Sequence, residues 1–486
     1  MKFSGIYYGS LTNLYLCKNF SYSNFPVFIT YKLVLLFFLF PYMHIENLNR
    51  TYKNNTKHSN LLYKKSLRFF PGGISHNIRF FTPYPFFVKR ALGRYLFDVD
   101  GNTYTDYWMG HWALILGHSP KNVSLALSKQ VKNGTLYGTV NTVSVELAET
   151  IQKLMPKAEK LRFATTGSEA TMYAVRLARA VTKKKIVAKI IGGWHGFNSS
   201  LLESVNYPFD INEGLGLDVD NKYIQSIPFN DLHKSLQILN KIRDDLACII
   251  VEPILGGAGC ITPNNDYLQG LQEFSKKNNI IFILDEIVTG FRLSIHGAYK
   301  MFKLDPDLFT LGKIAGGGLP IGIVCGKSEI LSISNPIDKN NKNLICSIGG
   351  GTFSSNPVTM IAGLKTLEYL QTNKKMVYSK INELGAYTRK ELQKIFDENN
   401  IDVKITGIGS LFNIHFLNNN VREINNSNDV ALTDKEKLRK YHFALISKYK
   451  IFFLPLKMGA ISFQHSKADI DKLLTSTRSI IESKIL

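Results

Sequence analysis

The chain has 486 residues, of which 45% are hydrophobic, so it can bury a sizeable core and is expected to form a large domain and a smaller one. Its formal net charge of +21 would suit a polyanion, but we find no basic stripe with interleaved aromatic residues and expect no nucleic-acid partner. Its five cysteines include no CxxC pair, which favours a reducing cytoplasm and indicates neither a disulfide framework nor a metal site.

The chain begins with a hydrophobic and basic extension. Residues 25–43, FPVFITYKLVLLFFLFPYM, are nearly long enough to span a bilayer, but the run contains Lys32 and has a proline near each end. We interpret residues 1–42 as an extension outside the mature protein, with Met43 as the start of translation. A signal anchor is the alternative, although we expect no association with a membrane.

Residues 43–110 are expected to form an N-terminal segment with a hairpin. In YLFDVDGNTYTDY, residues 95–107, apolar and polar positions alternate around Asp100 and Gly101. This pattern predicts two antiparallel strands joined by a primed turn.

Residues 111–345 are expected to form the large domain. From about residue 140, helical patterns such as VELAETIQKLM, TMYAVRLARAV and LQGLQEFSKKN alternate with strand patterns such as KIVAKII, ACIIVEP and IIFILDE. Such alternation predicts an α/β fold with a mostly parallel sheet, and its continuous apolar strands indicate burial on both faces. Residues 346–486 have longer helices and fewer strands, which predicts a smaller α+β domain.

The first candidate site is a helix start in TTGSEATMYAVRLARAV, residues 165–181. Gly167 and Ser168 precede an apolar helix face, so free backbone N–H groups and a hydroxyl would lie in the first turn, where a phosphate is stabilised. The alternative is an ordinary serine cap of a helix.

Two further candidates come directly after apolar runs. Asp285 ends IIFILD, where its carboxylate could pair with a cationic ring nitrogen; a structural aspartate or a metal ligand is the alternative. Lys313 stands before Gly316, Gly317 and Gly318, and burial beside small residues would favour the neutral amine that forms a Schiff base. Taken alone, Lys313 is more typical of a surface lysine.

Together the three features match what pyridoxal 5′-phosphate requires: a phosphate anchor, a partner for the pyridine nitrogen and a Schiff-base lysine, in that order on a parallel sheet. Parallel sheets gather their ligands at the carboxyl ends of the strands, where Asp285 and Lys313 are expected. We therefore interpret Lys313 as the catalytic lysine.

Over residues 68–482 the chain resembles the class III pyridoxal-phosphate aminotransferases of fold type I. The motifs that carry this resemblance stand in the family's order and spacing: FPGGISHNIRFF, YLFDVDGNTYTDY, ILGHSP, TTGSEATMYAVRLARA, IIVEPILGG, ILDEIVTGFR, DLFTLGKIAGGGLPIG and GTFSSNPVTM. Within the family the chain is most similar to aminomutases, which shift an amino group within one amino-aldehyde and pass through the pyridoxamine form of the cofactor. Transfer between a separate donor and an oxo-acid or aldehyde acceptor is the alternative.

The resemblance implies roles for residues that surround the cofactor. It implies that Gly167 and Ser168 hold the phosphate, Trp194 and His195 lie over the ring, Asn230 approaches the ring hydroxyl, Glu252 and Asp285 flank the pyridine, Ile287 packs beneath it, and Thr352 reaches the phosphate of a neighbouring subunit. The role of Thr352 implies a homodimer.

For the substrate, the resemblance implies that Arg79 binds a carboxylate and that Trp112 belongs to the pocket. This chain departs from the family's aminomutases at His76 and Asn77, which replace Ser-Pro, and at Lys457, which replaces a glutamate. Residues 203–216, ESVNYPFDINEGLG, also replace a gating loop rich in serine and glycine. These departures leave the substrate open, and Lys457 is a candidate for a second carboxylate site.

Overall fold

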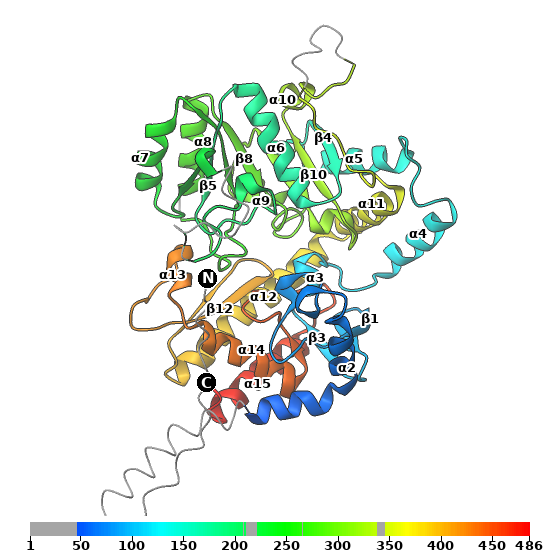
Figure 1. The fold of residues 1–486 in the computed structure, drawn as a ribbon, viewed down its shortest axis with the longest axis vertical. Coiled ribbons are helices and arrows are strands. Elements are labelled where there is room, and N and C mark those ends of the chain that lie inside the picture. Colours follow the sequence, from blue (N-terminus) through cyan, green and yellow to red (C-terminus); the bar gives the residue numbers. More distant parts are fainter. Residues whose placement is uncertain (1–45, 208, 210–220, 265, 338–345) are drawn as a thin grey trace, which may run out of the picture. The chain divides into compact units, whose positions relative to one another are not determined.

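The computed structural model describes residues 46–207, 209, 221–264, 266–337 and 346–486 (Figure 1). The chain divides into two compact units, Met1–Asn47 and Leu48–Leu486, and only residues 46 and 47 of the first are described. The apolar stretch 25–43 and the start expected at Met43 therefore lie outside the described residues. Within the described part, no helix combines the length and apolar character needed to cross a membrane.

A seven-stranded sheet forms the centre of the larger unit. Its strands are β4 (Lys160–Ala164), β5 (Ile186–Ile190), β6 (Ile224–Ile227), β7 (Leu246–Val251), β8 (Ile281–Asp285), β9 (Leu308–Gly312) and β10 (Gly322–Gly326). They are ordered β4-β10-β9-β8-β7-β5-β6, and only β10 runs against its neighbours. The predicted α/β fold with a mostly parallel sheet is confirmed.

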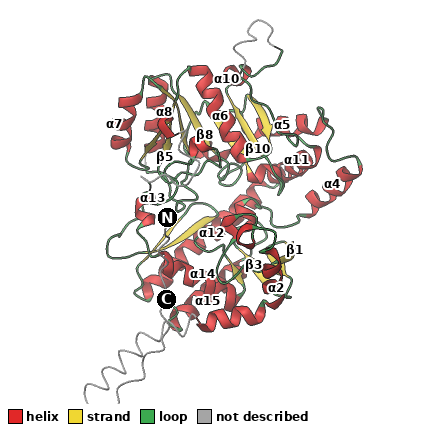
Figure 2. Ribbon diagram, in the orientation of Figure 1, coloured by secondary structure: helices red, strands yellow, loops and turns green. Residues whose placement is uncertain are grey.

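Helices bury this sheet on both faces, as the continuous apolar strands predicted (Figures 1 and 2). Helix α6 (Gly167–Thr182) crosses strands β4 and β7–β10, and α8 (Tyr267–Lys277) packs on β7 and β8 beside α7 (Leu232–Ile242). Along β8, Ile281 and Ile283 belong to the apolar cluster of α6, whereas Phe282 and Leu284 belong to a second cluster with α8. Successive side chains of a strand point to opposite faces, so both faces are core.

The N-terminal strands form a second sheet, with the order β1 (Val88–Leu92), β2 (Tyr95–Asp98), β3 (Thr103–Asp106) and β13 (Ile451–Phe452). Strands β2 and β3 pair antiparallel, so the predicted hairpin is confirmed. The predicted primed turn is wrong, because only Gly101 of the loop has a positive φ, +88°. The Asp98 carboxylate accepts the N–H groups of Asp100 and Asn102, which stabilises a longer loop.

The C-terminal part combines a three-stranded sheet with long helices. The sheet is ordered β11 (Val403–Thr406), β12 (Leu411–Phe416) and β14 (Gly459–Ala460), and the helices are α11 (Pro357–Thr372), α12 (Lys374–Glu398), α13 (Ser427–Ala431), α14 (Lys435–Tyr449) and α15 (Lys467–Glu482). Further α-helices are α2 (Lys57–Ser66), α3 (Met109–Trp112), α4 (Lys121–Lys132), α5 (Thr142–Leu154), α9 (Gly297–Met301) and α10 (Ser328–Ser332). The domain boundaries expected at 110/111 and 345/346 stay predictions.

A fully buried arginine ties three distant segments together. The guanidinium of Arg292 donates to the carbonyl oxygens of Trp112 and Ile461, at 2.6 and 3.2 Å, and to Ser410 Oγ at 3.3 Å. Each of these oxygens accepts a hydrogen bond from a charged donor that has no access to water. The chain near Trp112 is therefore fixed against the C-terminal sheet.

Candidate functional site

A cavity of about 770 Å³ lies at the carboxyl ends of the central strands. It is lined by the first turn of α6, the segments that follow β5, β7, β8 and β9, residues from the N-terminal segment, and Lys457 near the C-terminus. Ten of the predicted site residues line it: Gly167, Ser168, Trp194, His195, Glu252, Asp285, Ile287, Lys313, Trp112 and Lys457.

Asp285 and Lys313 meet because their strands are neighbours. Strands β8 and β9 pair in parallel with Asp285 opposite Thr310, and Lys313 follows the end of β9. Burial lowers the pKa of Lys313, and the charges of Asp285 and Glu252 partly oppose this shift. The neutral form of the Lys313 amine is therefore easier to reach than in water, although two carboxylates lie nearby.

The Asp285 carboxylate is held by three donors. One oxygen accepts from Thr310 Oγ1 at 2.9 Å and from the Ile287 N–H at 3.1 Å, and the other lies 2.7 Å from His195 Nδ1. An ionised carboxylate only accepts, so Nδ1 is the donor, and one of about four acceptor positions is left for a ligand. His195 Nε2 is buried without a partner among the described residues.

Glu252 is a second buried acid of the cavity. Its oxygens accept the Trp194 N–H at 3.0 Å and the Gly256 N–H at 3.2 Å. Burial raises the pKa of Glu252 to about 6, His195 opposes this shift, and the nearby charge of Asp285 adds to it. Glu252 therefore lies close enough to His195 and Asp285 to share their electrostatic environment.

The first turn of α6 offers free donors to the cavity. Thr166 and Glu169 form a capping box, while the N–H groups of Gly167 and Ser168 have no partner within the described part of the chain. A Cβ on Gly167 would come within 2.7 Å of Ile287, so only glycine allows this close packing without a shift. The result is an open helix N-terminus, which suits an anion.

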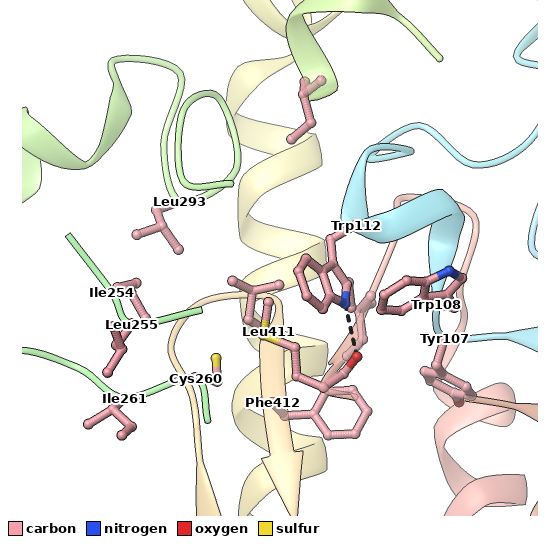
Figure 3. Packing of buried hydrophobic residues seen from close by; sticks show 14 of the residues in the cluster. Tyr107, Trp108, Trp112, Ile254, Leu255, Cys260, Ile261, Leu293, Leu411 and Phe412 are labelled. Carbon is pink, nitrogen blue, oxygen red and sulfur yellow. Dashed lines mark hydrogen bonds between the residues drawn. The ribbon is translucent and has the colours of Figure 1, made fainter. Parts of the chain in front are cut away.

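The cavity is also lined by tryptophan, histidine and lysine side chains. Trp112 is buried, and its Nε1 donates to the Met458 carbonyl oxygen at 2.9 Å (Figure 3). His76 and His111 line the cavity with ring centroids 5.6 Å apart, and Lys457 lies in the same wall. Burial, then the charges of Arg79, His76, Lys313 and Lys457, lower the pKa of His111 to about 4.

Three predicted residues are not among those that line the cavity. Asn230 cannot freely turn to a ligand, because its side chain donates to the carbonyl oxygens of Thr262 and Asn425 and accepts the Asn264 N–H. Arg79 and Thr352 are exposed side chains. The roles expected for these three residues stay predictions, and that of Thr352 concerns a neighbouring subunit.

Trp194 and His195, which the resemblance implied to lie over a ligand ring, both line the cavity, and that role of His195 stays a prediction. Its ring is bound edge-on to the Asp285 carboxylate through Nδ1. Trp194 is partly exposed and contacts Phe197 at 4.9 Å between ring centroids. Stacking of Trp194 on a ligand ring stays a prediction.

Sequence reasoning missed two residues of the site. His111 lines the cavity and belongs to the motif GHWALILGH, in which only the adjacent Trp112 was predicted to be a site residue. Thr310 Oγ1 donates to the Asp285 carboxylate. Because β8 and β9 are neighbouring strands, the sequence could have indicated that Thr310 lies beside Asp285. Val205 and Asn206 also line the cavity, but most of the loop 203–216 lies outside the described residues.

A comparison with known families places this cavity in context. The model of the family described as "Aminotransferase class-III" matches residues 79–438. The chain belongs to the class III aminotransferases. The predicted family and its fold type are thereby confirmed, and this aminotransferase is an enzyme rather than an idle binding protein.

Two curated relatives of this aminotransferase carry the same name. The chain is 36% identical over 419 residues to glutamate-1-semialdehyde 2,1-aminomutase of Methanosphaera stadtmanae, with 85% of this chain and 96% of the relative covered. It is 36% identical to the enzyme of the same name from Methanocaldococcus jannaschii, with 87% and 97% covered.

Solved structures show the same fold. An ω-transaminase from Sphaerobacter thermophilus superposes with a TM-score of 0.81 at 26% identity and covers 87% of this chain and 97% of its own. A glutamate-1-semialdehyde aminomutase from Pseudomonas aeruginosa, in complex with PMP, gives a TM-score of 0.83 at 19% identity, with 91% and 98% covered. The second likeness, at this low identity, concerns the fold alone.

Proposed function

We propose that this aminotransferase is a glutamate-1-semialdehyde 2,1-aminomutase, which converts glutamate 1-semialdehyde to 5-aminolevulinate, the precursor of tetrapyrroles. The observation that carries the proposal is the meeting of Lys313, Asp285 and the first turn of α6 in one cavity. Curated relatives with this name align with the chain over nearly their whole length, at 36% identity. We expect a cytoplasmic homodimer in which Thr352 contributes to the partner's site.

The cavity fits pyridoxal 5′-phosphate. The free N–H groups of Gly167 and Ser168 match a phosphate, and the remaining acceptor position of Asp285 matches a protonated ring nitrogen. The partnerless His195 Nε2 is a buried polar atom that a ligand would satisfy. When bound, the cofactor supplies an electron sink and carries the amino group.

The chain's own residues then have distinct tasks. Lys313 would hold the cofactor through its neutral amine, and once released its amine would serve as general base and acid for proton transfer. Asp285 would stabilise a protonated ring nitrogen, because a carboxylate beside a cation favours the charged form. His195 fixes the orientation of that carboxylate through Nδ1.

The reacting groups lie among buried side chains. Glu252 and Asp285 are buried, Lys313 is half-buried, and the buried side chains of Trp108 and Trp112 line the same cavity. Low solvent access strengthens each electrostatic contact and protects a reactive amino-aldehyde from side reactions. Retention of the substrate between the two amine transfers distinguishes an aminomutase from other members of the family.

The test gives purified protein, loaded with the pyridoxamine form, glutamate 1-semialdehyde as its only substrate. Many turnovers of 5-aminolevulinate per site, without an added amino donor or acceptor, are expected. A single turnover or none would contradict an intramolecular amine shift.

The second candidate is an aminotransferase that moves an amine between separate molecules. It is favoured by Lys457 in the cavity wall and by the likeness to an ω-transaminase. In that case a donor amino acid alone would convert the bound cofactor to its pyridoxamine form. Failure of every donor tested to change the cofactor's absorbance would exclude it.

A further inference from the structure

Two acids, Glu252 and Asp285, and two lysines, Lys313 and Lys457, line the same cavity. The acids Glu252 and Asp285 both raise the pKa of Lys313, so these three groups lie near one another. For Lys457 no carboxylate opposes the effect of burial. The described cations and titratable groups whose charges couple to Lys457 are His111, which also couples to Lys313, and Lys435 on α14.

Two polar side-chain atoms of this region lack hydrogen-bond partners. Lys457 Nζ has neither a hydrogen bond nor an ion pair within the described part of the chain, and His111 Nε2 is buried without a partner. By contrast, the Asp285 and Glu252 carboxylates are occupied by protein donors. Lys457 is half-buried in this wall, and an anionic ligand would supply the charged acceptor that its amine lacks.

Arg79, the other candidate for binding a carboxylate, differs from Lys457 in its exposure. Arg79 is exposed and is not among the cavity-lining residues, although His76 and Asn77 of the same turn are. Its charge nevertheless lowers the pKa of His111, as does that of Lys457, so substitutions of both residues are needed to compare them.

We propose that Lys457 is the residue that anchors the substrate's carboxylate in the cavity that Lys313 and Asp285 also line. His76 and His111 flank this anchor and supply ring N–H donors or apolar faces to the chain of the substrate. The inference rests on the proposed function, because it takes the reacting carbon to be beside Lys313. It assigns the substrate class as a short carbonyl compound with a terminal carboxylate.

The test measures binding to the pyridoxal-loaded enzyme by titration calorimetry. Levulinate has a carbonyl and a terminal carboxylate, and 2-pentanone has the same carbon chain without the carboxylate. We expect Lys457→Met to lower levulinate affinity about tenfold or more, while affinity for 2-pentanone stays the same. Lys457→Arg is expected to retain most of the levulinate affinity.

The matched control is Lys435→Met. Lys435 lies near Lys457, but its Nζ donates to Thr433 Oγ1 and it does not line the cavity. A change below about threefold is expected, because no direct contact to the ligand is lost. If Lys457→Met does not yield folded holoenzyme, Lys457→Gln replaces it.

Undiminished levulinate binding by Lys457→Met or Lys457→Gln overturns the inference. The result is independent of turnover: levulinate binding that requires Lys457, in a protein that forms no 5-aminolevulinate, supports the anchor and rejects the aminomutase. Formation of 5-aminolevulinate by a protein that binds levulinate without Lys457 supports the aminomutase and rejects the anchor.

Discussion

The two parts of the cavity wall differ in how their polar groups are satisfied. Around Asp285 the side chains bind one another, so their positions are fixed before any ligand enters. In the part of the wall with Lys457, His111 Nε2 has no partner among the described residues. The first arrangement suits chemistry, which needs fixed geometry, and the second suits binding, which gains from groups that only the ligand satisfies.

The largest expected effect comes from Lys313. Lys313→Ala removes the amine that binds the cofactor and moves protons, so turnover should fall by at least about a thousandfold. Thermal unfolding should change little, because the variant loses no described hydrogen bond. Steady-state assays with glutamate 1-semialdehyde and a thermal melt test this; residual turnover near that of the wild type would contradict the assignment.

A smaller loss is expected for Asp285→Asn. The amide keeps the shape of the side chain but removes the charge that stabilises a protonated ring nitrogen, so turnover should fall about a hundredfold. The cofactor should still bind through the first turn of α6. Cofactor content is measured after dialysis, beside the rate; equal rates for variant and wild type would leave Asp285 with a structural role only.

The comparison of Arg79 with Lys457 separates two carboxylate sites. Lys457→Met should raise KM for glutamate 1-semialdehyde about tenfold with a smaller change in kcat, and Arg79→Met should raise it about twofold, because Arg79 is exposed. Steady-state kinetics of both variants at constant ionic strength give the ratio of the two changes in KM. A larger effect of Arg79→Met would favour the role that the family resemblance implied.

The smallest effect concerns pH. Burial lowers the pKa of Lys457 below its ordinary 10.5, so the cation is present at low pH and is lost as pH rises through the lowered value. Levulinate affinity should therefore weaken by a few-fold toward alkaline pH. Other groups coupled to this region are Lys313, His76, Arg79, His111 and Lys435, of which His111, with a pKa of about 4, stays neutral throughout this range.

The matched variant for the pH profile is Lys457→Arg. A guanidinium stays protonated to higher pH, so its affinity for levulinate should remain constant where that of the wild type declines. Identical profiles for wild type and Lys457→Arg would assign the titration to another group.

The sheet and its catalytic edge were predictable because they depend on local patterns. Apolar runs predicted β7 and β8, and the residues after β8 and β9 had to meet because neighbouring parallel strands end at one edge. The hairpin at residues 95–107 followed from alternation. Its turn type did not, since the Asp98 side chain replaces a primed turn by binding N–H groups of the loop.

Contacts between distant segments were beyond sequence reasoning. Asn230 bonds to the Asn425 carbonyl oxygen 195 positions away, and no local pattern signals that its amide is already occupied. Similarly, only the folded chain shows that Lys457 and His111 share one wall. The family motifs supplied the residue types of the site but not the state of their hydrogen bonds.

The buried guanidinium of Arg292 bears on how the protein is made. It binds carbonyl oxygens of Trp112 and Ile461, and the cavity itself needs residues from Ser75 to Lys457. The N-terminal part of the chain leaves the ribosome first, so the central sheet can form early. The site is complete only after the C-terminal segment with Lys457 has been synthesised. A stop codon at position 457 would leave Arg292 without its Ile461 acceptor and yield a chain with most of its sheet but no complete binding site.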